Sequence, residues 1–226
     1  MIKVELHAHT SDDPGDWVPH HTQALLNHAA RSGYGGLAVT LHNRWFDPTP
    51  FQAQAVALGI VLISGIERTI DGKHVLLINV PREAGDVRTF DDVRALKQHV
   101  PGALVIAPHP FYPIPSALGD RLDGIVDVVD AVEVNAMYTR GLDYNRQARA
   151  WAAANGKPLV GNTDLHRLDQ IGTTWSEVDA APDADAICAA IRAGRVVVRS
   201  RPLSWPRAVW TMARMEIGGW GRGHLR

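Results

Sequence analysis

The sequence predicts an α/β fold that closes like a barrel, and three observations indicate it. Short apolar, β-branched segments alternate with helix-like segments along most of the chain, which is typical of parallel strands joined by crossover helices. Seven main strands are predicted, one fewer than in the usual α/β barrel. A chain of 226 residues with 46% hydrophobic residues is long enough for one sizeable core, so we expect a single domain over residues 1–226.

The elements follow from local composition. Runs rich in Val, Ile and Leu predict the main strands, which are 2–6, 36–40, 60–67, 103–108, 131–135, 158–162 and 195–200. A further run at 73–80 predicts a hairpin partner for the third strand. Helix-like segments lie between the strands at 22–32, 49–58, 90–99, 143–155 and 184–193.

The C-terminal stretch 203–226 predicts an amphipathic helix and tail. It contains Trp205, Trp210 and Trp220 with little acidic charge, and the helix should end near Gly218 and Gly219. We expect it to pack onto the barrel. An oligomer contact and attachment to a membrane surface are the alternatives, and the oligomeric state stays open.

Composition bounds the partners and the compartment. A formal net charge of −1 gives no general attraction to a polyphosphate backbone, so nucleic acid is not the expected partner. The single cysteine, Cys188, cannot form an internal disulfide and suits a reducing compartment. Lys3, Glu5 and His7 interrupt any N-terminal signal sequence, and no later segment is apolar enough to span a bilayer. We therefore expect a cytoplasmic protein.

Side chains of the kinds that bind metals follow six consecutive predicted strands. The carboxyl ends of parallel strands meet at one mouth, so these side chains should lie together. Residues two apart in extended chain point to the same side, which pairs His7 with His9 and Asp164 with His166. The full set is His7, His9, Asp12, Asp13, His42, Glu67, His74, His109, Glu133, Asp164 and His166.

Each of these residues alone is explained as a structural side chain, but the set is not. So many ionisable groups at one mouth would desolvate one another at high cost, and divalent cations relieve that cost. Imidazole and carboxylate donors without thiolates suit Zn²⁺, Mn²⁺ or Fe²⁺. There are more candidate ligands than one ion takes, so the sequence predicts a metal cluster.

Five motifs resemble the successive motifs of the PHP (polymerase and histidinol phosphatase) family. In order they read "ELHAHTSDDP", "AVTLHN", "GIERTIDGKHVLLI", "APHP" and "GNTDLH", and they extend from residue 5 to about residue 170. The resemblance implies a distorted (β/α)7 TIM-like barrel with two or three metal ions at its mouth and hydrolysis of phosphate esters. One departure is Thr40-Leu41-His42, where the family motif usually reads Thr-Asp-His, and this change alters the surroundings of the ligands.

The resemblance also implies a ligand set for each ion. His7, His9, Glu67 and Asp164 would hold the first ion. Glu67 would bridge to a second ion held by His74 and His109. A third ion would take His42, His166 and an acid of the first loop, for which Asp13 is preferred and Asp12 is the alternative.

The resulting hypothesis is a metal-dependent phosphatase acting on a small metabolite or nucleotide. Two ions that share Glu67 would lower the pKa of a bridging water to give hydroxide, with Glu67 and Asp164 as the catalytic residues. One alternative is a phosphodiesterase or exonuclease acting on nucleic-acid ends. Another is a metal-stabilised scaffold without catalysis, against which the near-complete ligand set argues.

Further residues on the mouth loops are candidates for substrate binding. Arg44, Arg68 and Arg140 could hold a phosphate through paired hydrogen bonds, or be exposed loop charges. Asn135 and Tyr138 could line the pocket or support the metals. We expect the remaining histidines to be non-ligands, namely His20, His21, His28, His99 and His224.

Overall fold

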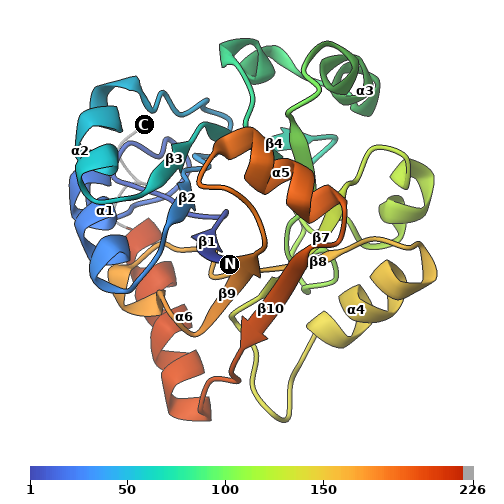
Figure 1. The fold of residues 1–226 in the computed structure, drawn as a ribbon. Coiled ribbons are helices and arrows are strands. Elements are labelled where there is room, and N and C mark those ends of the chain that lie inside the picture. Colours follow the sequence, from blue (N-terminus) through green and yellow to red (C-terminus); the bar gives the residue numbers. More distant parts are fainter. Residues whose placement is uncertain (221–226) are drawn as a thin grey trace.

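The structure, a computed structural model, describes residues 1–220, with side chains through residue 214. In this range ten strands form two five-stranded sheets, and Figure 1 shows helices arranged around them. The first sheet has the order β10-β9-β1-β2-β3 and the second β4-β5-β6-β7-β8. The strands are β1 Ile2–Glu5, β2 Gly36–Ala38, β3 Val61–Ile63, β4 Gly65–Ile70, β5 Lys73–Ile78, β6 Leu104–Ala107, β7 Ala131–Asn135, β8 Leu159–Asn162, β9 Thr174–Val178 and β10 Val196–Ser200.

The predicted helices are confirmed with small changes at their ends. They are α1 Thr22–Arg31, α2 Gln52–Ala57, α3 Phe90–His99, α4 Asn145–Ala154, α5 Ala184–Arg192 and α6 Trp205–Trp220. Side-chain hydrogen bonds cap the N-termini of two of these helices. Thr89 forms a capping box with Asp92 at α3, and Asp183 accepts a hydrogen bond from the Ala186 N–H at α5. Cys188 is buried in α5, as its apolar surroundings in the sequence predicted.

Strand directions place one set of carboxyl ends on the same side of the molecule. β1, β2 and β3 are parallel, as are β6, β7 and β8. The predicted hairpin is confirmed, since β4 and β5 are antiparallel and β5 is antiparallel to β6. β4 therefore runs in the same direction as β6, and its ligand-type residues face the same side as those that follow β6, β7 and β8.

The two sheets approach each other at two places. The predicted strand 60–67 is divided into β3 and β4 at Ser64, whose hydroxyl donates to the Val80 carbonyl at 2.7 Å. At the second place β8 lies against β9, where the Gly161 N–H donates to Ser176 Oγ at 2.8 Å. The fold is a mixed α/β fold whose hydrogen-bonded ladder is not continuous through the described residues.

The structure differs from the prediction at β9 and β10. The segment Thr174–Val178 had not been predicted as a strand, because buried Thr174 and Ser176 conceal the alternation of apolar residues. β9 is antiparallel to β1, and β10 is antiparallel to β9. The expectation that 195–200 continues the parallel series directly was therefore wrong.

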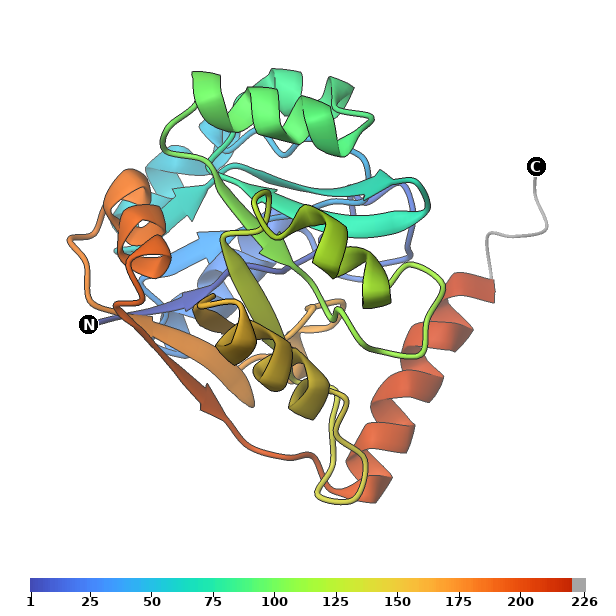
Figure 2. The same ribbon diagram turned by 90° about the vertical axis from the view of Figure 1, so that its right-hand side faces the viewer.

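Helix α6 lies on the side of the molecule opposite the N-terminus (Figure 2). Ala208 is buried and Arg214 pairs with Asp169 at 3.2 Å, but Trp205 and Trp210 are 56% and 60% exposed. The expected packing onto the barrel is therefore only partial. The remainder of the predicted tail, residues 221–226 with His224, lies outside the described residues. Within the described range no helix is long and apolar enough to cross a membrane.

Candidate metal centre

Five imidazoles surround the carboxylate of Glu67 on β4, which is 1% exposed. Its Oε2 lies 3.2 Å from His7 Nε2, 3.3 Å from His9 Nε2 and 3.2 Å from His42 Nε2. Its Oε1 lies 2.6 Å from His74 Nδ1 and 3.3 Å from His109 Nε2. The two oxygens of one carboxylate thus face two different groups of imidazoles.

Local backbone pairing places His7, His9, Asp164 and His166 together. The chain stays extended beyond β1, where the His9 N–H donates to the Leu165 carbonyl and the Leu165 N–H donates to the His7 carbonyl. Asp164 has a φ of +53°, a left-handed conformation that aspartate tolerates better than most residues. Its Oδ1 lies 3.3 Å from His7 Nε2 and 3.4 Å from His9 Nε2.

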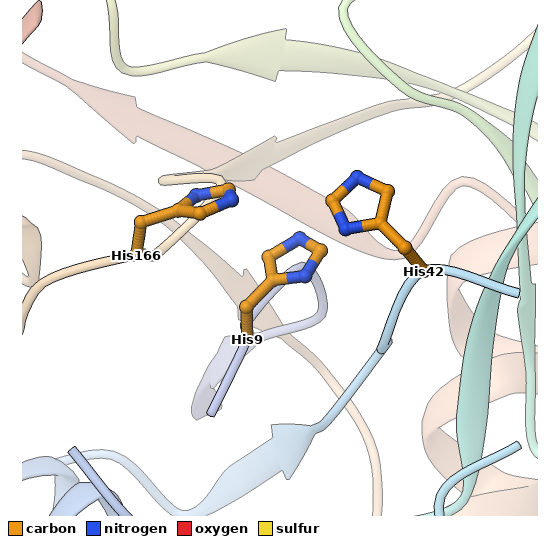
Figure 3. A group of neighbouring side chains, drawn as sticks. All are labelled: His9, His42 and His166. Carbon is orange, nitrogen blue, oxygen red and sulfur yellow. The ribbon is translucent and has the colours of Figure 1, made fainter. Parts of the chain in front are cut away.

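A second group lies beside the first and consists of His9, His42 and His166. Figure 3 shows these three rings approaching one another from separate segments of the chain. The His9 ring stacks on His42 and on His166, with centroids 4.6 and 4.3 Å apart. One nitrogen of each ring lies within 4.8 Å of the others, so the three histidines are close enough to bind one metal ion together.

Two buried carboxylates orient the imidazoles from outside. Glu133 on β7 lies 2.8 Å from His7 Nδ1, and Asp13 lies 2.7 Å from His9 Nδ1 and 3.1 Å from His42 Nδ1. A carboxylate on one ring nitrogen fixes the tautomer and directs the other nitrogen toward the centre. For His7, His9 and His42 the nitrogen that faces Glu67 is therefore Nε2.

The charges of the cluster lower the pKa of Glu67 and raise the pKa of His7. Burial raises the pKa of Glu67, but His7, His109 and His74 lower it by more, so the pKa lies well below its ordinary value. Burial lowers the pKa of His7, whereas Asp164, Glu133 and Glu67 raise it well above its ordinary value. The carboxylates therefore hold positive charge on the imidazoles, and a divalent cation can supply that charge in place of protons.

The donor set fits divalent transition metals. His9 Nε2 is buried between Glu67 and Asp164 and makes no hydrogen bond of normal geometry in the described part of the chain. Triplets of donor atoms suited to one ion include His7, His9 and Glu67, and separately His42, Glu67 and His74. Nitrogen and carboxylate donors with no thiolate among them are typical of catalytic Zn²⁺, Mn²⁺ or Fe²⁺ sites.

The structure separates the three acids of the first loop. Asp12 is exposed, and its backbone carbonyl accepts a hydrogen bond from Arg44. The carboxylate of Asp13 also accepts from the backbone N–H groups of Gly15, Asp16 and His42. Asp16, which sequence reasoning missed, lies 3.0 Å from His166 Nε2 and 3.8 Å from His42 Nδ1. Its place in the same loop was the signal that could have included it.

The hydrogen bonds of the candidate substrate residues go to groups other than the imidazoles. Arg68 alternates with Glu67 along β4, and its guanidinium donates to the Val87 carbonyl and to Asn43. Asn135 is buried and donates to Glu133 at 2.9 Å. Tyr138 accepts from the Ser200 hydroxyl at 2.9 Å. Arg140 is exposed on the loop after β7.

Comparisons with known proteins bear on the family and the fold of the chain. Residues 143–196 match the model of a family described as PHP-associated. An uncharacterized protein of Methanocaldococcus jannaschii, MJ1587, is 30% identical over 126 residues, which cover 54% of this chain and 70% of the relative. The fold and the cluster define an α/β protein with a candidate multinuclear metal centre, and the chain belongs to the PHP domain family.

Solved structures share the fold at low identity. A two-domain protein of Bacteroides vulgatus containing a predicted PHP-like metal-dependent phosphoesterase is similar with a TM-score of 0.70 and 19% identity, covering 95% of this chain and 69% of that one. PsfC of Pseudomonas syringae gives 0.67 and 18%, covering 96% and 98%. The lesion-specific endonuclease EndoQ of Pyrococcus furiosus gives 0.61 and 14%, covering 96% and 68%.

Proposed function

We propose that this protein is a metal-dependent phosphoesterase that hydrolyses a phosphomonoester of a small metabolite or nucleotide. The observation that carries the proposal is the position of Glu67. Its Oε2 faces His7, His9 and His42 while its Oε1 faces His74 and His109. A carboxylate shared in this way is suited to bridge two metal ions.

The residues that would hold the ions follow from the contacts. We assign His7, His9, Glu67 and Asp164 to the first ion, and Glu67, His74 and His109 to the second. For a third ion we assign His42, His166 and Asp16. Asp16 replaces Asp13 in this assignment because the oxygens of Asp13 already accept hydrogen bonds from two imidazoles and three backbone N–H groups.

When bound, divalent ions would supply Lewis-acid stabilisation of the phosphoryl oxygens and would acidify water at neutral pH. The chain's own part is to keep the donors in place. Glu133 and Asp13 hold the Nδ1 atoms of His7, His9 and His42. Glu5 accepts from the backbone N–H groups of His7 and Thr163, which ties the two ligand-bearing loops together.

We also propose that the two sheets form the distorted barrel of this family. The passage from β3 into β4 and the contact of β8 with β9 support it. In such a barrel the carboxyl ends of the strands line one mouth, which is where the ligand-type residues of this chain lie.

A nucleic-acid substrate is the second candidate. The fold is similar to that of endonuclease Q, which has been solved with a 27-mer duplex carrying an abasic lesion. The net charge of −1 favours a small substrate, because binding to a long polyanion depends on many cationic contacts. A scaffold without catalysis is disfavoured by the number of donors that converge on Glu67.

The test combines elemental analysis with phosphate release from a panel of mono- and diesters, for the wild type and Glu67→Gln. We expect at least two transition-metal ions per chain and release from monoesters that Glu67→Gln abolishes. Glu177→Gln, which removes a partly exposed carboxylate paired with Arg199, is the matched control and should keep both. Metal content near zero, with no activity on adding Mn²⁺, Fe²⁺ or Zn²⁺, would overturn the proposal.

A further inference from the structure

An open cavity of about 600 Å³ lies outside the metal centre and is lined by Arg140, Arg201 and Trp205, with Thr139 and Ser204 beside them. We call it the Arg140–Arg201 cavity. The loop after β7 and the segment after β10 form it. The Leu203 N–H donates to the Tyr138 carbonyl at 2.8 Å and keeps these two segments side by side.

Strand direction places this cavity on the same side as the metal centre. β10 is antiparallel to β9 and β9 is antiparallel to β1, so β10 runs in the direction of β1. Arg201 directly follows β10 and Arg140 follows β7. Arg140 lies five positions after Asn135, which contacts Glu133 in the metal centre. The extended chain limits that separation to about 18 Å, within reach of a substrate of two nucleotide units.

The two arginines of the cavity carry uncompensated charge. Through the described residues no hydrogen bond or ion pair holds the guanidinium of Arg140 or Arg201, and no carboxylate lines the cavity. The neighbouring Arg199, in contrast, pairs with Glu177 at 3.0 Å. Two like charges at one cavity repel each other, and an anion with several acceptor oxygens relieves that repulsion through charge-assisted hydrogen bonds.

Trp205 adds a flat apolar surface to the same cavity. The residue is 56% exposed, and its indole ring lies against Gly141, where an added Cβ would be 3.4 Å from Cζ2. A free indole face beside guanidinium groups suits a planar ring that carries a phosphate, because bases stack on tryptophan with little dependence on sequence.

We propose that the Arg140–Arg201 cavity binds a nucleotide part of the substrate that is not hydrolysed, with its phosphate on the two arginines and its base on Trp205. This rests on the proposed function and narrows its substrate to a nucleotide with a second phosphate. Hydrolysis at the metal centre would release the terminal monoester phosphate, with water supplying the oxygen of the free phosphate and the proton of the alcohol product, while the cavity holds the adjoining unit. The unit belongs to a short free nucleotide, in accord with the net charge of the chain.

Kinetics with two substrates test the cavity. A 5′-phosphorylated dinucleotide carries the second unit, and p-nitrophenyl phosphate lacks it. We expect Arg140→Gln and Arg201→Gln each to raise KM for the dinucleotide about 10-fold with kcat little changed. Both should leave kcat/KM for p-nitrophenyl phosphate within twofold, and Arg199→Gln should alter neither substrate. Equal effects on the two substrates, or none, would overturn the proposal.

Binding measured without catalysis separates this proposal from the proposed function. The probe is a dinucleoside monophosphate, which has no monoester phosphate, titrated into the metal-loaded protein while tryptophan fluorescence is followed. We expect quenching that Trp205→Phe diminishes, with about 10-fold weaker binding in Arg201→Gln. If this holds while no monoester is hydrolysed, the cavity stands and the proposed function fails. If p-nitrophenyl phosphate is hydrolysed but Arg201→Gln binds the probe as tightly as the wild type, the cavity proposal is overturned while the proposed function is kept.

Binding of a single-stranded 20-mer is measured last. It shows whether the nucleotide unit in the cavity belongs to a short free nucleotide or to a strand of nucleic acid. We expect the dinucleotide to bind at least as tightly as the 20-mer. If only the 20-mer binds, and Arg201→Gln abolishes that binding, the assignment to a short free nucleotide is overturned. The cavity would then be a binding site for a strand of nucleic acid.

Discussion

Glu67 organises the candidate site at the scale of single residues. It is buried, and its two oxygens lie within 3.3 Å of five imidazole nitrogens. Asp13 and Glu133 do not face the same centre but hold the opposite ring nitrogens. Glu67 and the imidazoles therefore offer donor atoms for metal ions, whereas Asp13 and Glu133 orient the imidazole rings. Substitutions in these two groups of residues should differ in their effects.

Glu67→Ala should remove more than one metal ion per chain, because each oxygen of Glu67 faces a separate group of histidines. Activity should fall by about 10³-fold or more, as expected when a group shared by the whole site is lost. Elemental analysis of protein purified without chelator measures the first effect. A loss of one ion or fewer would show that the carboxylate is not shared.

Asp16→Asn should lower the metal content by at most one ion and reduce activity more gently than Asp164→Asn, because Asp16 contacts only the group around His166 and His42. Asp13→Asn should reduce activity mainly by releasing the Nδ1 atoms of His9 and His42. Metal content and kcat/KM of the three variants are compared. A harmless Asp164→Asn beside an inactive Asp16→Asn would reverse the assignment of the ions.

His20 predicts how stability depends on pH. Burial, together with the smaller effects of nearby His166 and Arg167, lowers the pKa of His20 to about 4, whereas in the unfolded chain it is about 6.5. The unfolded state therefore binds the proton first, and the free energy of unfolding falls as the pH drops from about 6.5 to 4. After allowance for partial solvent access the loss is about 1–2 kcal/mol.

Urea unfolding at pH 8 and pH 4.5 checks this dependence. His20→Gln should lose less stability than the wild type between the two pH values, because it has no proton to take up. His99→Gln, at the exposed end of α3, should behave as the wild type. Identical pH profiles for His20→Gln and the wild type would contradict the prediction.

At the scale of secondary-structure elements, the contact between β8 and β9 brings the two sheets together beside the site. Gly161 permits this contact, because a Cβ there would lie 2.8 Å from the Trp175 carbonyl oxygen and 2.9 Å from Val198 Cγ1. β8 leads directly into Thr163, Asp164 and His166. The spacing of these two strands therefore affects the ligands that follow.

Gly161→Ala should destabilise the protein by about 1–3 kcal/mol, because backbone and a packed side chain must move to admit the methyl group. Denaturant unfolding measures the change. Gly124→Ala is the matched control, since an added Cβ there meets no atom within 4 Å. If both variants had the same stability, the close approach of β8 and β9 would not be a constraint.

At the scale of the whole molecule, charge and surface decide which substrate reaches the site. The net charge of −1 provides no general attraction for a long polyanion, and Arg140 and Arg201 lie together at one cavity. Exposed Trp205 and Trp210 are nevertheless present on α6, so stacking surfaces exist that composition had not indicated.

The wild type should therefore hydrolyse a small monoester faster than it cleaves duplex DNA, measured as kcat/KM at equal salt. Among the three mouth arginines first considered, Arg140→Ala should raise KM for a nucleotide. Arg44→Ala and Arg68→Ala should have smaller effects, because their guanidinium groups already donate to Asp12, and to Val87 and Asn43. Faster cleavage of DNA than of any monoester would favour the nuclease alternative.

The sequence by itself determined the alternation of strands and helices and the positions of most candidate ligands. This was possible because both depend on patterns of residues that are close together in the sequence. Apolar runs mark the strands, and His7, His9, His42, His109, Asp164 and His166 each follow such a run. The hairpin that carries Glu67 and His74 was equally visible, since its two strands are adjacent in the chain.

Only the tertiary structure decided how these residues share their partners. His7 meets Glu133 across 126 positions of the chain, and no local pattern encodes such a contact. The sharing of Glu67, the separate positions of Asp13 and Asp16, the pairing of β9 with β1, and the meeting of Arg140 with Arg201 all depend on contacts of this kind. They are decided by which distant strands and loops pack together when the core forms.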